Sequence, residues 1–269
     1  IKGRIMIKKY ILLIILVLFA GNLNAETKTY KMVFVPASEK GDESDYTSLI
    51  AITEKLTGFN IDTIKVTDYN AAVEAMRAGR AHIAWYGGKT YVKAAEIANA
   101  EAFAAGVRPG EKDAGYYTYF VVKKNSAIKE FKDVKGKILS LNTIGSTSGD
   151  LIPQVELSKI NLSIRNKDHF DKVFYAGSHD ACLLAVLNNQ SDVCGMSSRN
   201  YEARLEDGTF KEEDVRIIHK SDRVPPPPLA YSKMIPKKDR DKIKQAVLDA
   251  HKHGEIGGYG GKMSHYMEV

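Results

Sequence analysis

Apolar positions along the chain follow two spacings that alternate from residue 31 to residue 251. Short runs of apolar and β-branched residues predict buried strands, and longer stretches with apolar residues three and four positions apart predict helices. The predicted strands are 31–36, 60–66, 82–85, 116–122, 138–142, 172–175, 192–196, 217–220 and 229–232. The predicted helices are 45–56, 69–78, 90–97, 151–159, 180–188, 200–205 and 239–251. This alternation predicts an α/β fold with mostly parallel sheets.

Two segments are predicted to cross between two lobes. One is the aromatic strand around 116–123, and the other is the stiff Pro225–Pro228 run. They divide the chain into a first lobe of residues 26–118 and 225–269 and a second, inserted lobe of residues 119–224. The glycine-rich end of the chain either covers a lobe or is a truncated end.

Residues 1–25 have the layout of a cleavable secretory signal. Basic residues without acidic ones precede an apolar run at 10–20, and a short polar stretch ends at Ala25. The apolar run is too short to span a membrane, which takes about 20 residues. Leu23 is larger than the residue expected three positions before a cut, so the cleavage site stays open. The sequence predicts export to the periplasm.

The net charge of the chain is small once residues 1–25 are set aside. The whole chain has 39 basic and 33 acidic residues and a formal net charge of +6. Four basic residues lie in 1–25, so the remainder has 35 against 33 and a net charge of +2. A nearly neutral protein lacks the positive footprint that nucleic acids require, and we expect no nucleic-acid partner.

The two cysteines, Cys182 on a predicted helix and Cys194 on a predicted strand, leave two alternatives open. In an exported protein they can form a disulfide. They can equally be two small buried residues, because sequence alone does not establish pairing.

A glycine-flanked run of hydroxyl residues is the strongest candidate site. Gly145–Gly149 reads GSTSG and lies between a predicted strand and a predicted helix. Backbone N–H groups at a helix start have no internal acceptor and attract anions. The hydroxyls of Ser146, Thr147 and Ser148 add hydrogen-bond donors. The alternative is a plain helix cap, for which Ser and Thr are common. No nucleotide-binding GxxxxGK[ST] pattern is present.

His179 lies at a second strand–helix junction, within the sequence Ser-His-Asp. It is a candidate donor to an anion, and the alternative is a helix-cap cluster. Three adjacent residues do not form a hydrolase triad, and no nucleophile elbow accompanies them. The seven histidines are scattered without metal-ligand spacing. We therefore expect no enzyme, no cofactor and no metal.

Two tyrosines complete the set of candidates. Tyr86 follows the predicted strand 82–85, and Tyr69 opens a predicted helix. Residues at the carboxyl ends of parallel strands face the crevice in which ligands bind. Packing in the core or between the lobes is the alternative for both.

Three segments together resemble the phosphate-, phosphite- and phosphonate-binding (PhnD-like) periplasmic proteins of ABC transporters. They are AMRAGRAHIAWYGGKTYVKA at 75–94, GSTSGDLIP at 145–153 and AGSHDACLLAVLNNQSDV at 176–193. The resemblance implies a type II periplasmic binding fold, in which two crossing strands join two α/β lobes around a ligand cleft. It also implies anion contacts from the six residues Ser146, Thr147, Ser148, His179, Tyr69 and Tyr86.

The resemblance also bears on ligand size. Relatives that bind aminoalkylphosphonates place acidic groups opposite the ligand's ammonium. The corresponding regions of this chain are residues 197–200 and 225–228, and they contain no acidic residue. It therefore implies a ligand without a tail: phosphite, methylphosphonate, phosphate or arsenate. Arg199 either adds a bidentate contact to this anion or is a surface arginine.

The resemblance implies a monomeric protein that captures a small oxyanion by closing its two lobes. The protein would then deliver the anion to an ABC permease in the inner membrane. A sensor subunit that signals to a membrane histidine kinase, for example in response to arsenate, is the alternative. A phosphorus-ester enzyme on the same fold is a third class, against which the lack of a nucleophile motif argues.

Overall fold

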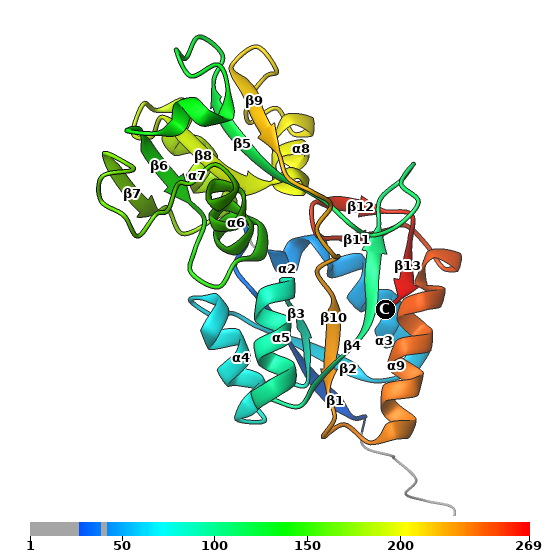
Figure 1. Cartoon of the computed structure of the whole chain (residues 1–269). Coiled ribbons are helices and arrows are strands. Elements are labelled where there is room, and N and C mark those ends of the chain that lie inside the picture. The colour runs from blue at the N-terminus through cyan, green and yellow to red at the C-terminus, as the bar shows by residue number, and fades with distance from the viewer. Residues whose placement is uncertain (1–26, 39–41) are drawn as a thin grey trace, which may run out of the picture.

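The computed structural model describes residues 27–38 and 42–269, and the predicted signal at 1–25 lies outside them. The chain forms two lobes, each built on its own sheet (Figure 1). Each lobe has its own hydrophobic core. No helix within the described ranges has the length and apolar character needed to cross a membrane.

The first lobe contains a six-stranded sheet with the order β13-β4-β10-β3-β1-β2. β1 runs parallel to β2 and β3, while β10 and β13 pair antiparallel to their neighbours. Its strands are β1 (Thr29–Phe34), β2 (Asn60–Ile64), β3 (Ile83–Trp85), β4 (Ala100–Val107), β10 (Leu229–Ser232) and β13 (His265–Glu268). Its helices are α2 (Asp42–Asp45), α3 (Thr47–Thr57), α4 (Tyr69–Arg77), α5 (Gly88–Ile97) and α9 (Lys237–Asp249). α3 packs against α9, and α4 packs against α5.

The second lobe contains a five-stranded sheet with the order β7-β6-β8-β5-β9. β6 runs parallel to β7 and β8, and β5 pairs antiparallel with β8 and β9. Its strands are β5 (Thr118–Lys123), β6 (Ile138–Leu141), β7 (Lys172–Tyr175), β8 (Val193–Ser197) and β9 (Val215–Lys220). Its helices are α6 (Ile152–Lys159), α7 (His179–Leu187) and α8 (Ser198–Glu206).

The chain passes between the two sheets after β4 and again after β9, and the two passages run side by side (Figure 1). Tyr116 and Val224 form an antiparallel bridge there, with N···O distances of 3.1 and 2.8 Å. The predicted α/β fold of two lobes joined by two crossing segments is confirmed. The expectation of mostly parallel sheets was wrong, because each lobe's sheet mixes parallel and antiparallel strand pairs.

Several local expectations were wrong. The sequence analysis missed β4, whose sequence AEAFAAGV is dominated by small residues of low strand preference. It also missed the C-terminal hairpin of β11 (Ile256–Gly258) and β12 (Gly261–Met263), and it missed β13, which pairs with β4. Residues 147–149, which were placed before the predicted helix 151–159, already belong to a π-helical turn, η2 (Thr147–Leu151).

The cysteines form a disulfide, which decides between the two alternatives. Cys182 on α7 and Cys194 on β8 have Cα atoms 5.6 Å apart and are bonded through sulfur. Both are fully buried, and the bond ties α7 to the central strand of the second sheet.

Candidate anion-binding site

Four helical segments begin between the lobes, each after a strand. β3 leads to α5 in the first lobe, while β6, β7 and β8 lead to η2, α7 and α8 in the second. The N-terminal end of a helix carries partial positive charge and unpaired N–H groups. Lys89 on α5 and Thr147 on η2 touch, so two such ends meet across the lobe boundary. This arrangement favours a negatively charged ligand.

The serine–threonine run forms the start of η2. Ser146 is its N-cap, and the Ser146 Oγ accepts the N–H of Gly149 at 3.1 Å. Leu151 donates its N–H to the Ser146 carbonyl at 3.1 Å, which gives the turn its wider π spacing. Ser146, Thr147 and Ser148 are all buried. The first-turn N–H groups and hydroxyls therefore lie together in an environment of low polarity, where hydrogen bonds to an anion are strong.

Gly149 allows this turn to lie against its neighbours. A Cβ at this position would lie 2.3 Å from the Asn142 Cβ and 2.8 Å from the His179 Cε1. Both distances are shorter than real Cβ contacts. Only glycine fits between the end of β6 and the start of α7.

His179 presents a neutral N–H to the site. The N–H of Ser197 donates to its Nδ1 at 3.2 Å, so the ring proton is on Nε2. Nε2 lies 3.5 Å from the Ser148 Oγ. Burial lowers the pKa of His179 to about 3, so the ring is uncharged at neutral pH. Ser178 caps the same helix by accepting the N–H of Ala181 at 2.9 Å, so a cap and a candidate site residue are adjacent.

Tyr116, on the first crossing, was missed by the sequence analysis. Its side chain is buried beside the hydroxyls of Ser148 and Thr147. Burial raises the pKa of Tyr116, and these neighbouring hydroxyls only partly oppose the shift, so it keeps its proton and remains a donor. The one feature of the sequence that pointed to Tyr116 was its position at the start of the predicted crossing strand 116–122.

Tyr69 lies beside Ser146. The Nδ2 of Asn142, a residue that the sequence analysis also missed, donates to the Tyr69 hydroxyl at 3.4 Å and to the Ser146 Oγ at 3.3 Å. A Cβ on Gly145 would lie 3.1 Å from the Tyr69 Cβ, so the two lobes are in close contact here. Asn142 therefore orients a tyrosine of the first lobe toward the serines of the second.

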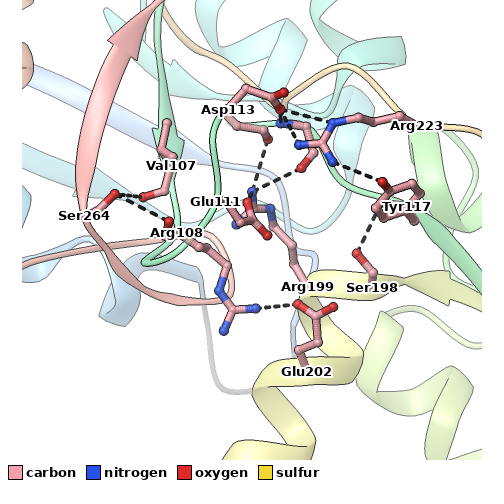
Figure 2. Close-up of polar contacts among 12 residues, drawn as sticks. Val107, Arg108, Glu111, Asp113, Tyr117, Ser198, Arg199, Glu202, Arg223 and Ser264 are labelled. Atoms are coloured by element: carbon pink, nitrogen blue, oxygen red, sulfur yellow. Dashed lines mark hydrogen bonds and ion pairs between the residues drawn. The ribbon is translucent and has the colours of Figure 1, made fainter.

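Tyr86 and Arg199 use their polar groups elsewhere. The Tyr86 hydroxyl donates to the Ala72 carbonyl at 3.2 Å inside the first lobe. Arg199 is buried and donates to Glu111 at 2.8 Å and to the Ala114 carbonyl at 3.2 Å (Figure 2). The structure therefore brings five of the seven candidates together, while the Tyr86 hydroxyl and the Arg199 Nη2 are engaged elsewhere. The Arg199 Nη1 is buried and has no hydrogen-bond partner among the described residues.

Contacts between the lobes surround the site. The Lys89 N–H donates to the Thr147 Oγ1 at 2.9 Å, and the Lys89 Nζ pairs with Asp150 at 2.6 Å. Burial alone would raise the pKa of Asp150, but hydrogen bonds from Lys89 and Tyr175 outweigh it and hold the pKa below its usual range. The Asp150 carboxylate is thus neutralised by the side chains of Lys89 and Tyr175 and does not oppose an anion nearby.

The donors that converge are neutral hydroxyls, N–H groups and an imidazole. Such a set suits an anion that is removed from water, because each ligand oxygen receives hydrogen bonds without the cost of burying a full countercharge. Within residues 27–38 and 42–269, no three His, Cys, Asp or Glu side chains lie close enough to hold a metal ion.

The buried neutral imidazole predicts a loss of stability in acid. The pKa of His179 is about 3 in the folded protein and 6.5 in its ordinary state. The unfolded chain therefore binds more protons between these values, and the stabilising contribution present above pH 6.5 is lost as the pH falls toward 3. The free energy of unfolding should fall by up to about 1.4 kcal/mol per pH unit from this group.

Urea unfolding at a series of pH values checks this for His179→Gln, with exposed His253→Gln as the control. His179→Gln should flatten the pH dependence and His253→Gln should not. Equal slopes in the wild type and His179→Gln would contradict the assignment.

The chain is similar to a known family of proteins. A family model described as the phosphonate periplasmic substrate-binding protein of ABC transporters matches residues 32–258. The phosphonates-binding periplasmic protein of Escherichia coli is 29% identical over 212 residues, which cover 77% of this chain and 61% of that protein. The phosphate-import protein PhnD of Mycolicibacterium smegmatis is 27% identical over 206 residues, covering 73% of this chain and 64% of that protein. The chain thus matches less than two thirds of the length of both.

The fold is shared with solved structures. PhnD1 from Prochlorococcus marinus, solved in complex with methylphosphonate, superimposes with a TM-score of 0.74 at 19% identity. The match covers 90% of this chain and 93% of that one. The likeness supports the type II periplasmic binding fold predicted from the sequence.

Proposed function

Because the chain belongs to the family of phosphonate periplasmic substrate-binding proteins of ABC transporters, we propose that it captures a small tetrahedral oxyanion for import. The ligand class is phosphonate, phosphite, phosphate or arsenate. The observation that carries the proposal is the convergence of the buried, neutral side chains of Ser146–Ser148, Tyr116 and His179 at the boundary between the lobes.

Contacts across the lobe boundary support a closure mechanism. The anion docks on η2 in the second lobe, and Tyr69 and the start of α5 then approach from the first. Thr147 links directly to Lys89, so the group that holds the ligand also holds the lobes together. The ligand favours the closed form because only that form completes its shell. Tyr69 acts as a donor to the bound anion.

The geometry of His179 argues against an enzyme. A serine nucleophile needs an imidazole whose Nε2 accepts its proton and whose Nδ1–H is held by an acceptor. Here Nδ1 itself accepts from the Ser197 N–H, so Nε2 carries the proton. An imidazole with a pKa of about 3 is also a weak base. The protein binds its ligand without transforming it.

The family supports a proposal for the partner and the location. The protein acts in the periplasm as a monomer, after removal of residues 1–25, and presents its closed form to an ABC permease. Import takes precedence over the sensor role because the matched family is described as a transporter component. We place the lobe boundaries at 118/119 and 224/225, beside the Tyr116–Val224 bridge.

Thermal unfolding of the ligand-free mature protein tests the proposal. The panel is phosphate, phosphite, methylphosphonate, aminoethylphosphonate, arsenate and arsenite. A ligand at 100 times its Kd adds about 2.7 kcal/mol, which raises the Tm by several degrees. We expect this shift with at least one of the tail-less phosphorus or arsenic(V) anions.

The double variant Ser146→Ala/Thr147→Ala should lose the shift, and the exposed Ser163→Ala should keep it. A wild-type protein whose Tm is unchanged by every anion would refute the proposal.

A further inference from the structure

Aromatic side chains fill the space on one side of the anion site. The ring of Tyr259 lies 4.6 Å from that of Trp85 and 6.3 Å from that of Tyr116, which it meets edge-on. The Tyr116 side chain in turn lies beside the hydroxyls of Thr147 and Ser148. Tyr259 is therefore separated from the anion-binding hydroxyls by a single side chain.

Tyr259 reaches this position from the C-terminal hairpin. It follows β11, and the turn it shares with Gly260 leads into β12. The hairpin is anchored on the first lobe, where the Gly257 N–H donates to the Ser48 Oγ at 3.0 Å. The Tyr266 hydroxyl donates to the Gly257 carbonyl at 2.9 Å.

The tip of the hairpin rests on the second lobe. The Tyr259 hydroxyl donates to the Asn200 Oδ1 at the start of α8. A Cβ on Gly260 would lie 2.9 Å from the Arg199 Cβ and 3.1 Å from the Arg199 carbonyl oxygen. With φ at +79°, glycine suits this close approach. The ring of Tyr259 is thus fixed at both ends, by the hairpin behind it and by α8 at its hydroxyl.

Little space remains around the ring. The cavity bordered by Tyr46, Trp85, Arg199, Leu229 and Tyr259 has a volume of about 10 Å³. This volume holds about one water molecule. Among the described residues that border this cavity, Arg199 alone is charged, and it pairs with Glu111, so this part of the wall offers no acidic partner for a cationic group.

We propose that Tyr259 is a specificity-determining residue, whose ring fills the space that the organic substituent of a larger phosphonate would need. This rests on the proposed function and narrows its ligand class to anions no larger than methylphosphonate. Size exclusion comes from a residue of the C-terminal hairpin, and the donors to the anion oxygens are separate from it.

Calorimetric titration of the mature protein with phosphate, methylphosphonate and propylphosphonate tests this. In the wild type, propylphosphonate should bind at least 100-fold more weakly than the better of the two small anions. Tyr259→Ala should reduce this difference to about 10-fold or less, through tighter binding of propylphosphonate. Tyr259→Phe keeps the ring and removes the hydroxyl that bonds to Asn200, so it should retain the wild-type discrimination.

Tyr259→Leu serves if the alanine variant does not fold, since it shortens the side chain and keeps an apolar contact with Trp85. A folded Tyr259→Ala or Tyr259→Leu that binds the small anion and still rejects propylphosphonate would overturn the inference and leave the proposed function intact. Equal wild-type affinity for propylphosphonate and the small anions would also overturn it. If the wild-type protein bound none of the anions, the result would refute the proposed function itself.

Discussion

Gly149→Ala should abolish oxyanion binding and lower the free energy of unfolding by about 2–3 kcal/mol. The added methyl group would lie 2.3 Å from the Asn142 Cβ and 2.8 Å from the His179 Cε1. Neither neighbour can retreat easily, because Asn142 follows β6 and His179 is held by the Ser197 N–H. Relief of the clash must move η2, and with it the N–H groups and hydroxyls that receive the anion.

The effect on binding should be at least as large as the effect on folding. Displacement of donors by about 1 Å leaves several hydrogen bonds to the anion unmade, and each unpaired buried group costs about 1–3 kcal/mol. We expect at least a 100-fold loss of affinity by calorimetric titration, together with a lower midpoint in urea.

Gly88→Ala is the matched control for this experiment. It adds the same methyl group on the facing helix α5, where the nearest atom is the Thr147 Oγ1 at an ordinary distance of 3.7 Å. Alanine also favours the helix over glycine. Gly88→Ala should fold as the wild type does, and its affinity should fall far less than that of Gly149→Ala. A Gly149→Ala protein with unchanged affinity would contradict the role given to η2.

Reduction of the Cys182–Cys194 disulfide should lower the free energy of unfolding by about 3 kcal/mol. The bond closes a short loop, with a sequence separation of 12. A loop of about this length restricts the unfolded chain by roughly this amount. The loss should reduce the urea midpoint by about 1 M, given an unfolding slope of about 2–3 kcal/mol per M.

Urea unfolding with and without a thiol reductant measures this effect. The double variant Cys182→Ala/Cys194→Ala should unfold at a lower midpoint than the oxidised wild type and should not respond to the reductant. An unchanged wild-type curve, with both thiols shown to be free by a thiol-reactive reagent, would refute the stabilising role. Because Cys182 lies one turn after His179 on α7, the reduced protein should also bind its anion more weakly.

Local chemistry made a large part of the fold and site predictable. The alternation of strands and helices predicted the two α/β lobes, since the two spacings of buried positions are properties of the chain itself. The GSTSG run and His179 were identified because glycine, hydroxyl and cap residues at a strand–helix junction interact with backbone groups only a few positions away in the sequence. Ser146 and Ser178 do serve as caps, as one alternative held.

Other parts of the site depended on partners distant in sequence. Tyr86 and Arg199 lie at strand ends that face the lobe boundary, but the Ala72 carbonyl and Glu111 take up their polar groups. Tyr116 reaches the serines only because the chain crosses between the lobes beside Val224. No short pattern in the sequence encodes these pairings.

The sequence by itself determined the class of fold, the family and the segment that we propose receives the anion, because each rests on residues that are close together along the chain. The tertiary structure decided the pairing of the cysteines, the strands β4 and β13 and the position of Tyr259 beside the site. Each of these depends on which surfaces are buried against each other after the chain has folded. Hydrogen bonds and packing between distant segments are selected by that burial and leave no periodic pattern in the sequence.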